Sequence, residues 1–217
     1  GPDGTDSINQ SIEGYLHLEN KHRLDHHGPA IMDMSKVHAI PHEFKNVQGG
    51  KEVIYQQDGI KITAFDVDHE PIEPAVGYII EYNGKKVVIS GDTAKSPLLE
   101  RAAKGADLLV HEALASHMVQ SMTAALEKRG QNNTATITRD ILDYHATPTE
   151  AAESAQTAGV KQLVLSHLVP PLPSAYLYPA FLADAPDKFD GPIIVGEDGM
   201  FFSLPANKTD IKQTQLK

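Results

Sequence analysis

The sequence predicts an α/β fold in mixed layers, and two patterns indicate this class. Residues 52–90 carry segments rich in Val, Ile and Tyr, joined by the turns Gln57-Asp58-Gly59 and Asn83-Gly84. Such a run predicts antiparallel strands, because the central positions of a tight hairpin turn favour Asn and Gly. After residue 90, apolar segments alternate with segments of helical periodicity, which is typical of helices packed on a sheet.

Each element is assigned from its own local pattern. Residues 7–20 have a partial helical period, whereas residues 21–50 are irregular and rich in turn residues. Thr147 and Pro148 suit the cap and the first turn of a helix. Helices are therefore expected at residues 7–20, 97–104, 114–129 and 148–158. Strands are expected at residues 52–55, 60–67, 75–82, 86–90, 107–111 and 162–165, with a final pair at 192–195 and 200–204 around Asp198-Gly199.

The length and net charge of the chain limit the classes of protein to which it can belong. A chain of 217 residues with 41% hydrophobic residues is long enough for one domain with a sizeable core, or one domain with an extra arm. Asp and Glu number 29 against 19 Lys and Arg, which gives a formal net charge of -10. That balance argues against a broad phosphate-binding surface, so nucleic acid is not expected as a partner. A small local phosphate site is compatible with it.

The residue types that are absent also narrow the chemistry. The sequence has no cysteine, which excludes disulfides, thiolate metal sites and cysteine nucleophiles. The 11 histidines are then the natural ligands for a transition metal. No apolar run approaches the roughly 20 residues of a membrane-spanning helix, so no membrane partner is expected. The chain shows no targeting segment, and the compartment stays open.

Four apolar segments end in polar side chains that can bind a metal ion. Rigid strand ends fix such donors while the loops that follow leave access to them. Imidazole and carboxylate groups are the donors that zinc prefers when no thiolate is present, and manganese or iron also accept them. For Asp92 the alternative is a plain turn in which its side chain caps a helix at Ala94. The segments are 65–69, ending in His69; 87–93, with Asp92; 108–112, ending in His111-Glu112; and 163–167, ending in His167.

The order and spacing of several motifs carry a resemblance that runs from about Gly50 to the end of the chain. The motifs are His69 followed by Gly77-Tyr78, Ser90-Gly91-Asp92-Thr93, and the segments 107–113, 144–152 and 165–171. This part resembles the C-terminal half of a metallo-β-lactamase-fold hydrolase. The branch it resembles holds the tRNA 3′-processing endonucleases (ribonuclease Z) and the arylsulfatase-like and phosphodiesterase-like enzymes. The implied fold is an αββα sandwich without its N-terminal part: one partial domain over residues 1–217, in which residues 1–50 form an irregular pocket or insert region.

The resemblance implies a site with two divalent metal ions, of which zinc is the expected identity and manganese or iron are acceptable. His69 would bind the first ion, Asp92 would bridge both, and His167 would bind the second. His145 would lie near the leaving group, where an imidazole can donate a proton. Glu112 would orient a histidine or a ligand. For His111, a structural hydrogen-bonded role is as well supported as a role in the site.

One motif of the family, H-x-H-x-D-H, is missing, since no His-x-His occurs in the chain. Arg23, His26 and His27 resemble a segment that the arylsulfatase-like branch carries near its substrate pocket, and a solvated polar loop is the alternative. Three explanations account for the missing ligands: the first half lies outside this chain, a separate chain supplies it, or the protein is degenerate. We favour the first. In isolation the fragment is expected to be inactive.

The leading hypothesis is a metal-dependent hydrolase that activates water against a small-molecule phosphodiester or sulfate ester, as the arylsulfatase-like branch does. The first alternative is tRNA 3′ processing, although only the short Asn83-Gly84 turn stands where such enzymes carry a Lys-rich arm. The second is a non-catalytic binding module with a vestigial metal site. The expected partners are the small ester substrate and either the missing N-terminal half or a complementary chain. A homodimer is compatible with the sequence.

Overall fold

The computed structural model of the chain describes residues 1–45 and 47–216. The chain divides into two compact units, Gly1–Asn46 and Val47–Lys217. Within the described residues, no helix is both long enough and apolar enough to cross a bilayer.

The first unit consists mainly of helix α1 (Thr5–His27), followed by a short 3-10 helix at Met34–Lys36. Helix α1 continues well past residue 20, so the prediction of an irregular segment there is wrong for residues 21–27. Ion pairs between side chains four residues apart, Lys21 with Asp25 and Arg23 with Glu19, extend the helix beyond its apolar positions. Helix α1 ends at Gly28, whose φ of 77° suits glycine.

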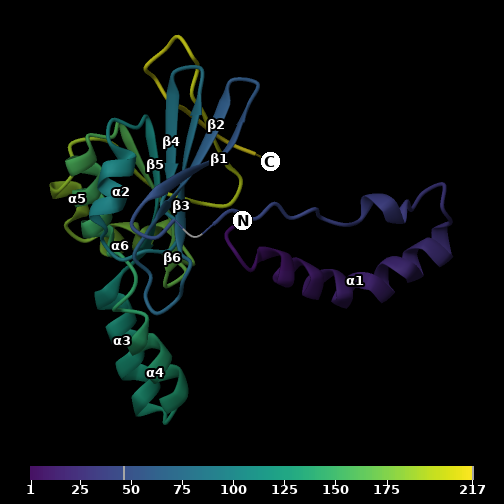
Figure 1. Ribbon diagram of the computed structural model, residues 1–217. Helices are drawn as coiled ribbons and strands as arrows, with labels where there is room; N and C mark the ends of the chain where they lie inside the picture. Colours follow the sequence, from purple (N-terminus) through teal and green to yellow (C-terminus); the bar gives the residue numbers. More distant parts are fainter. Residues whose placement is uncertain (46, 217) are drawn as a thin grey trace. The chain divides into compact units, whose positions relative to one another are not determined.

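The second unit is built on a seven-stranded sheet with the order β1-β2-β3-β4-β5-β6-β7 (Figure 1). Each of the strands β1 to β4 is antiparallel to its neighbour, and β4 to β7 are parallel. The antiparallel run predicted for residues 52–90 is therefore confirmed. The strands of this sheet are β1 (Lys51–Gln57), β2 (Ile60–Asp66), β3 (Val76–Tyr82), β4 (Lys85–Ile89), β5 (Leu108–Leu114), β6 (Gln162–Val169) and β7 (Ile193–Val195).

Local turn residues explain how the antiparallel strands connect. Asp58 and Gly59 between β1 and β2, and Asn83 and Gly84 between β3 and β4, all have positive φ. Two successive residues with positive φ are what a type I′ turn requires, and its twist matches that of the flanking strands. Both hairpins were predictable for this reason.

Helices cover one face of the sheet in the second unit. Figure 1 shows α2, α5 and α6 on the same side of the strands, while the α3–α4 hairpin projects away from them. Sheet residues such as Ile79, Val88 and Leu163 point into this core, which also contains many alanines of α5. The helices are α2 (Pro97–Ala103), α3 (Ser116–Lys128), α4 (Asn132–Asp140), α5 (Pro148–Ala158) and α6 (Tyr178–Leu182), with 3-10 helices at Ala175–Leu177 and Ala185–Asp187.

The beginning of α5 follows the predicted pattern. The Thr147 side chain accepts a hydrogen bond from the Glu150 backbone N–H, and the Glu150 side chain accepts one from the Thr147 backbone N–H. This capping box satisfies two N–H groups that the first turn of a helix leaves without partners. Helix α4 was not predicted, because its sequence of Asn, Thr and Ala residues gives no strong apolar period.

The predicted last strand pair is wrong. Residues 193–195 form β7, which pairs in parallel with β6, and β8 (Met200–Ser203) pairs with β9 (Lys212–Gln215) instead. The apolar β7 extends the buried parallel sheet, whereas the Asp198-Gly199 turn leads β8 out of it. Strand β9 carries only polar and charged residues, so its sequence contains no apolar alternation from which a strand could be predicted.

Candidate active site

The topology of the sheet explains why residues far apart in the chain can meet. Strand β2 is antiparallel to β3, and β3 is antiparallel to β4, so β2 and β4 run in the same direction. Strands β5 and β6 are parallel to β4. The C-terminal ends of β2, β4, β5 and β6 therefore lie at one edge of the sheet. His69 and Asp92 follow β2 and β4 as predicted, whereas His111, Glu112 and His167 lie within β5 and β6, which continue past the residues where these strands were expected to end.

Three histidines lie side by side at this edge. The ring centroids of His69 and His145 are 5.1 Å apart, and those of His145 and His167 are 5.8 Å apart. His69 Nδ1 lies 2.9 Å from the carbonyl oxygen of Tyr144. Because a carbonyl can only accept, His69 Nδ1 carries the proton and Nε2 keeps its lone pair. This is how histidines are commonly oriented when Nε2 binds a metal.

Asp92 reaches the same place from the loop after β4. Its Oδ2 lies 3.5 Å from His167 Nε2, and both side chains are about half exposed. The turn in front of it is made by Gly91, with a φ of 67°. Asp92 does not cap a helix. The cap of α2 is Ser96, whose side chain accepts a hydrogen bond from the Leu98 N–H.

His167 occupies an irregular position in β6. The pairing with β5 runs from Glu112 with Ser166 to Ala113 with Leu168, so His167 is an extra residue with no partner in the register. Its φ is +47°, an uncommon value for a residue other than glycine. A bulge of this kind redirects a side chain from the regular alternation of a strand, and such bulges occur often beside active sites.

Glu112, on β5, connects the parts of the site. Its Oε1 accepts hydrogen bonds from His145 Nδ1 at 2.8 Å, from the Thr93 N–H at 3.1 Å and from the Ala146 N–H at 3.2 Å. The side chain of Glu112 is 2% exposed, so these bonds form away from water. One carboxylate therefore orients the His145 ring and holds the loop that carries Asp92.

The electrostatic environment favours the charged form of His145. Burial by itself lowers the pKa of His145, but the hydrogen bond and charge of Glu112, with a smaller contribution from the Asp92 charge, outweigh burial and raise that pKa above its ordinary value. An imidazole whose protonated form is favoured in this way is suited to donate a proton near neutral pH.

His111 lies on the same strand, but its surroundings differ. It is completely buried, and its Nδ1 donates to the carbonyl oxygen of Glu112 at 2.7 Å. Among the described residues, His111 Nε2 and Glu112 Oε2 are the buried side-chain atoms without a hydrogen-bond partner. Burial lowers the pKa of His111 and outweighs its hydrogen bond and the charges of Glu112 and Glu150. This environment favours the structural role for His111.

The low pKa of His111 predicts acid destabilisation of the metal-free protein. The unfolded chain binds the proton first, near the ordinary His pKa of about 6.5, so the stability that His111 provides is present above that pH and is lost as pH falls below it. We expect the decline in Tm with acidification, measured by calorimetry in EDTA, to be shallower in His111→Gln than in the wild type. His22→Gln, an exposed substitution on α1, is the control and should keep the wild-type slope. Parallel curves for His111→Gln and the wild type would contradict the prediction.

The donor set supports part of a two-metal site. His69, Asp92 and His167 offer two imidazoles and a carboxylate, a set that matches zinc and related ions. Within residues 1–45 and 47–216, no group of three or more such side chains is arranged to hold one ion. The assignment of His69, Asp92 and His167 as metal ligands therefore stays a prediction.

The residues predicted for a substrate pocket belong to the first unit. Arg23, His26 and His27 lie on α1 in the first unit, where Arg23 pairs with Glu19 and the two histidine rings contact each other. Their role in a substrate pocket stays a prediction.

The structure also reveals residues that the sequence did not single out. The Tyr144 ring packs against His69 at right angles, with centroids 5.1 Å apart, and against His145 at the same distance. The Thr93 hydroxyl accepts a hydrogen bond from the Asp68 N–H at 3.1 Å, and so joins the His69 loop to the Asp92 loop. Each of these residues is adjacent in sequence to a predicted one, and that adjacency was the available signal.

Comparison with known proteins identifies the family. A model described as "Beta-lactamase superfamily domain" matches residues 4–168. A ribonuclease Z of Mycolicibacterium gilvum is 31% identical over 198 residues, 91% of this chain and 62% of that protein. A putative ribonuclease Z of Mycobacterium tuberculosis is 32% identical over 203 residues, 91% of this chain and 80% of that protein. The chain thus spans less than two thirds of the first relative.

Solved structures show the same fold. The short form of human tRNase Z has a TM-score of 0.54 at 20% identity, over 94% of this chain and 65% of that one. The metallo-β-lactamase fold protein YhfI of Bacillus subtilis has a TM-score of 0.51 at 18% identity, over 82% of this chain and 58% of that one. The mixed sheet with its helical layer is therefore a metallo-β-lactamase fold, as predicted.

The relatives correct one prediction. The expectation that nucleic acid is not a partner is wrong, because proteins about one third identical to this chain are named as ribonucleases. Net charge misled here because it averages over the whole surface, whereas a phosphate-binding region needs only a local excess of cations. With three quarters of its length matched by the family model, the chain belongs to the beta-lactamase superfamily.

Proposed function

We propose that this chain forms part of a metal-dependent hydrolase that cleaves phosphodiester bonds in RNA, at the 3′ end of tRNA precursors. The observation that carries the proposal is the His145–Glu112 pair placed beside His69, His167 and Asp92. A buried carboxylate that holds a histidine next to potential metal ligands is suited to protonate a leaving group. The ribonuclease Z names of the relatives support RNA as the substrate.

The roles of the residues follow from their positions. His69 Nε2, Asp92 and His167 would hold two divalent ions, zinc by the preference of this donor set, which would lower the pKa of a water and polarise the phosphoryl oxygens. The water gives up a proton to solvent as its oxygen bonds to phosphorus, and the bond between phosphorus and the ribose oxygen breaks. His145 gives its proton to that departing oxygen. Glu112 keeps the imidazole ring oriented and stabilises its charged form throughout.

The test of this function uses the complete gene product that carries this chain, loaded with zinc. A precursor tRNA with a 3′ trailer should be cut to release the trailer, and gel electrophoresis reports the products. A nitrophenyl sulfate assayed in parallel tests the arylsulfatase-like hypothesis. Hydrolysis of the sulfate with no cleavage of the RNA would overturn the proposal.

The metal ligands are tested by metal content. We expect His69→Ala and His167→Ala each to lower bound zinc, by about one of two ions, because each removes a ligand of a different ion. His145→Ala should retain the wild-type zinc content, because His145 is assigned to the proton rather than to the metal. The measurement is atomic emission spectrometry after zinc loading and dialysis. An equal loss in all three variants would show that the division between ligands and proton donor is wrong.

A further inference from the structure

Three adjoining cavities run along helix α2 in the second unit. The first, about 330 Å³, is lined by His69, Leu98 and Arg101 among others. The second, about 250 Å³, shares Leu98 and Arg101 with the first and adds Lys51. The third, about 270 Å³, shares Lys51 and Arg101 with the second. The cavities therefore form one groove from His69 past α2, with Arg101 lining it throughout.

The far end of this groove is strongly basic. Its lining includes Lys51, Lys61, Lys86 and Arg101 against one acidic residue, Glu81, and these four cations are called the basic end of the groove below. Lys61 pairs with Glu81 at 2.9 Å. Lys51 and Arg101 have no ion-pair partner within the described part of the chain. The chain as a whole carries a net charge of -10, so its overall composition does not explain this local excess of cations.

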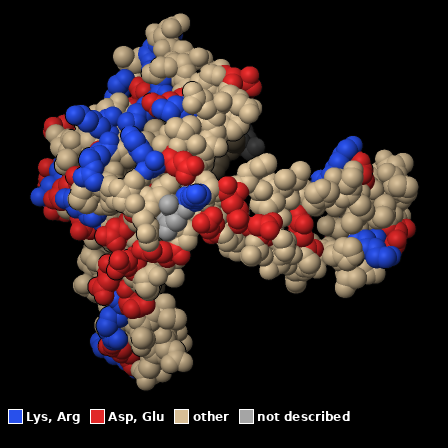
Figure 2. All heavy atoms as spheres, viewed as in Figure 1, with Lys and Arg blue, Asp and Glu red and all other residues tan. Residues whose placement is uncertain are grey.

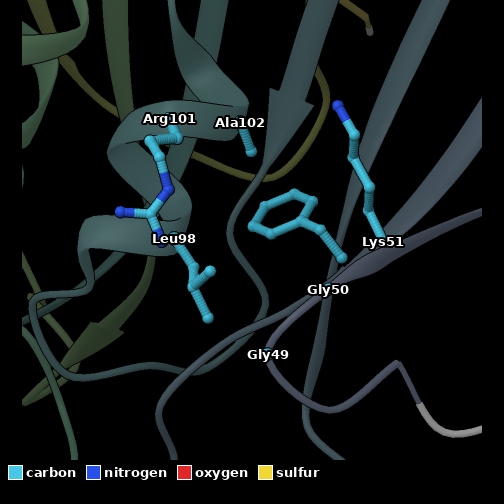
Figure 3. Close-up of a pocket in the computed structure, with 7 residues that line it drawn as sticks. Gly49, Gly50, Lys51, Leu98, Arg101 and Ala102 are labelled. Atoms are coloured by element: carbon cyan, nitrogen blue, oxygen red, sulfur yellow. The ribbon is translucent and has the colours of Figure 1, made fainter.

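Two of these cations, Lys51 and Lys86, also repel each other. Burial lowers the pKa of Lys86, the nearby Glu81 charge opposes this, and the positive charge of Lys51 lowers that pKa further. Figure 2 shows Lys and Arg side chains gathered over α2 and the neighbouring strands. In Figure 3, Arg101 extends from α2 toward Leu98, and Lys51 lies across the pocket from the helix. A bound anion would relieve this repulsion.

The shape of the groove fits an extended chain of phosphates. Alternate residues of β2, from Phe65 through Thr63 to Lys61, line it. At about 3.3 Å per residue these four steps span about 13 Å. Successive phosphates of an extended strand lie farther apart than the roughly 3.4 Å axial rise of a duplex, so a few phosphates fit along this length. Backbone phosphates would be recognised by charge, without a preference for sequence.

We propose that the basic end of the groove binds the phosphate backbone of an RNA substrate, away from the bond that is cut. This inference rests on the proposed function. Carboxylates such as Asp68 and Glu70 line the His69 end, whereas the lysines line the other end, where they can contact backbone phosphates beyond the one that reacts. The two strands between His69 and Asp92 are joined only by the tight Asn83-Gly84 turn, which offers no extended arm for RNA. The groove provides the contact instead.

The test measures binding of a fluorescein-labelled RNA stem with a 3′ extension, by anisotropy in EDTA so that no cleavage occurs. Lys51→Gln/Arg101→Gln should weaken binding about tenfold, and it should reduce the slope of log affinity against log salt by about 2, since each phosphate contact contributes about 0.9. Both residues are exposed, so the fold should be retained. The far-UV circular dichroism spectrum of this variant should match that of the wild type, which would show that weaker binding is not caused by unfolding.

The matched control is Lys128→Gln/Arg129→Gln, at the exposed end of α3, which changes net charge equally outside the groove. It should bind RNA like the wild type. Equal affinity of the groove variant and the control would overturn the inference. If precursor tRNA is cut while the groove variant binds normally, the inference fails and the proposed function stands. If RNA binds through the groove but precursor tRNA stays intact, the proposed function fails and the inference stands.

Discussion

Replacing His145 by Ala is expected to lower the rate of phosphodiester hydrolysis by 100-fold to 10,000-fold, a range of about 10²–10⁴ that is typical for the loss of a general acid. Glu112→Gln should lower the rate about 100-fold, because the amide keeps the shape of the side chain but not the charge that stabilises protonated His145. The double variant should be little slower than His145→Ala, since the two residues act as one unit. Steady-state kinetics with the zinc-loaded gene product measures all three.

The pH profile separates this role from a structural one. A general acid works in its protonated form, so the rate falls as pH rises above the pKa of His145. Glu112 raises that pKa, and Glu112→Gln should therefore shift the fall in rate toward lower pH. Glu127→Gln, an exposed substitution on α3, should leave both the rate and the profile unchanged. An unshifted profile in Glu112→Gln would contradict the role assigned to the pair.

Gly91→Ala should be strongly destabilising and should also displace Asp92. Gly91 has a φ of 67°, and an added Cβ would lie 2.5 Å from the Val76 carbonyl oxygen. That oxygen cannot easily move, because Val76 belongs to β3 and pairs with Asp66 of β2. A left-handed backbone conformation costs an L-residue about 1–2 kcal/mol. With the added clash, we expect Gly91→Ala to lower the free energy of unfolding by about 3 kcal/mol. For a chain of this size that corresponds to roughly 6–12 °C in Tm.

Gly105→Ala is the matched control for this prediction. Gly105 has nearly the same φ, 65°, but an added Cβ would meet nothing within 4 Å. Gly105→Ala should lower the free energy of unfolding by only about 1–2 kcal/mol, which is the cost of the backbone conformation alone. Calorimetry measures the stabilities. The zinc content depends on the position of Asp92, so it should fall in Gly91→Ala but not in Gly105→Ala. Equal losses of stability in the two variants would show that the contact with Val76 has no effect.

Local sequence was sufficient for the elements whose signals are local. Asn83-Gly84 has no practical alternative to a tight turn, and Thr147 with Glu150 satisfies the first turn of α5 within four residues. The pairing of β8 with β9 was not predicted, for the opposite reason. The partner of β8 is β9, which lies in a polar segment. The two strands pair through backbone hydrogen bonds, and the sequence of neither strand contains a pattern that predicts this pairing.

The sequence by itself supplied the candidate ligands: apolar runs that stop at polar residues indicated four segments, and the resemblance to metallo-β-lactamase-fold hydrolases selected His69, Asp92 and His167 among them. Only the tertiary structure decided how these residues work together. The bond from His69 to Tyr144 joins residues 75 positions apart, and the bond from Glu112 to His145 joins residues 33 apart. Such partners depend on the order and direction of strands in the sheet, and that order arises from packing over the whole unit.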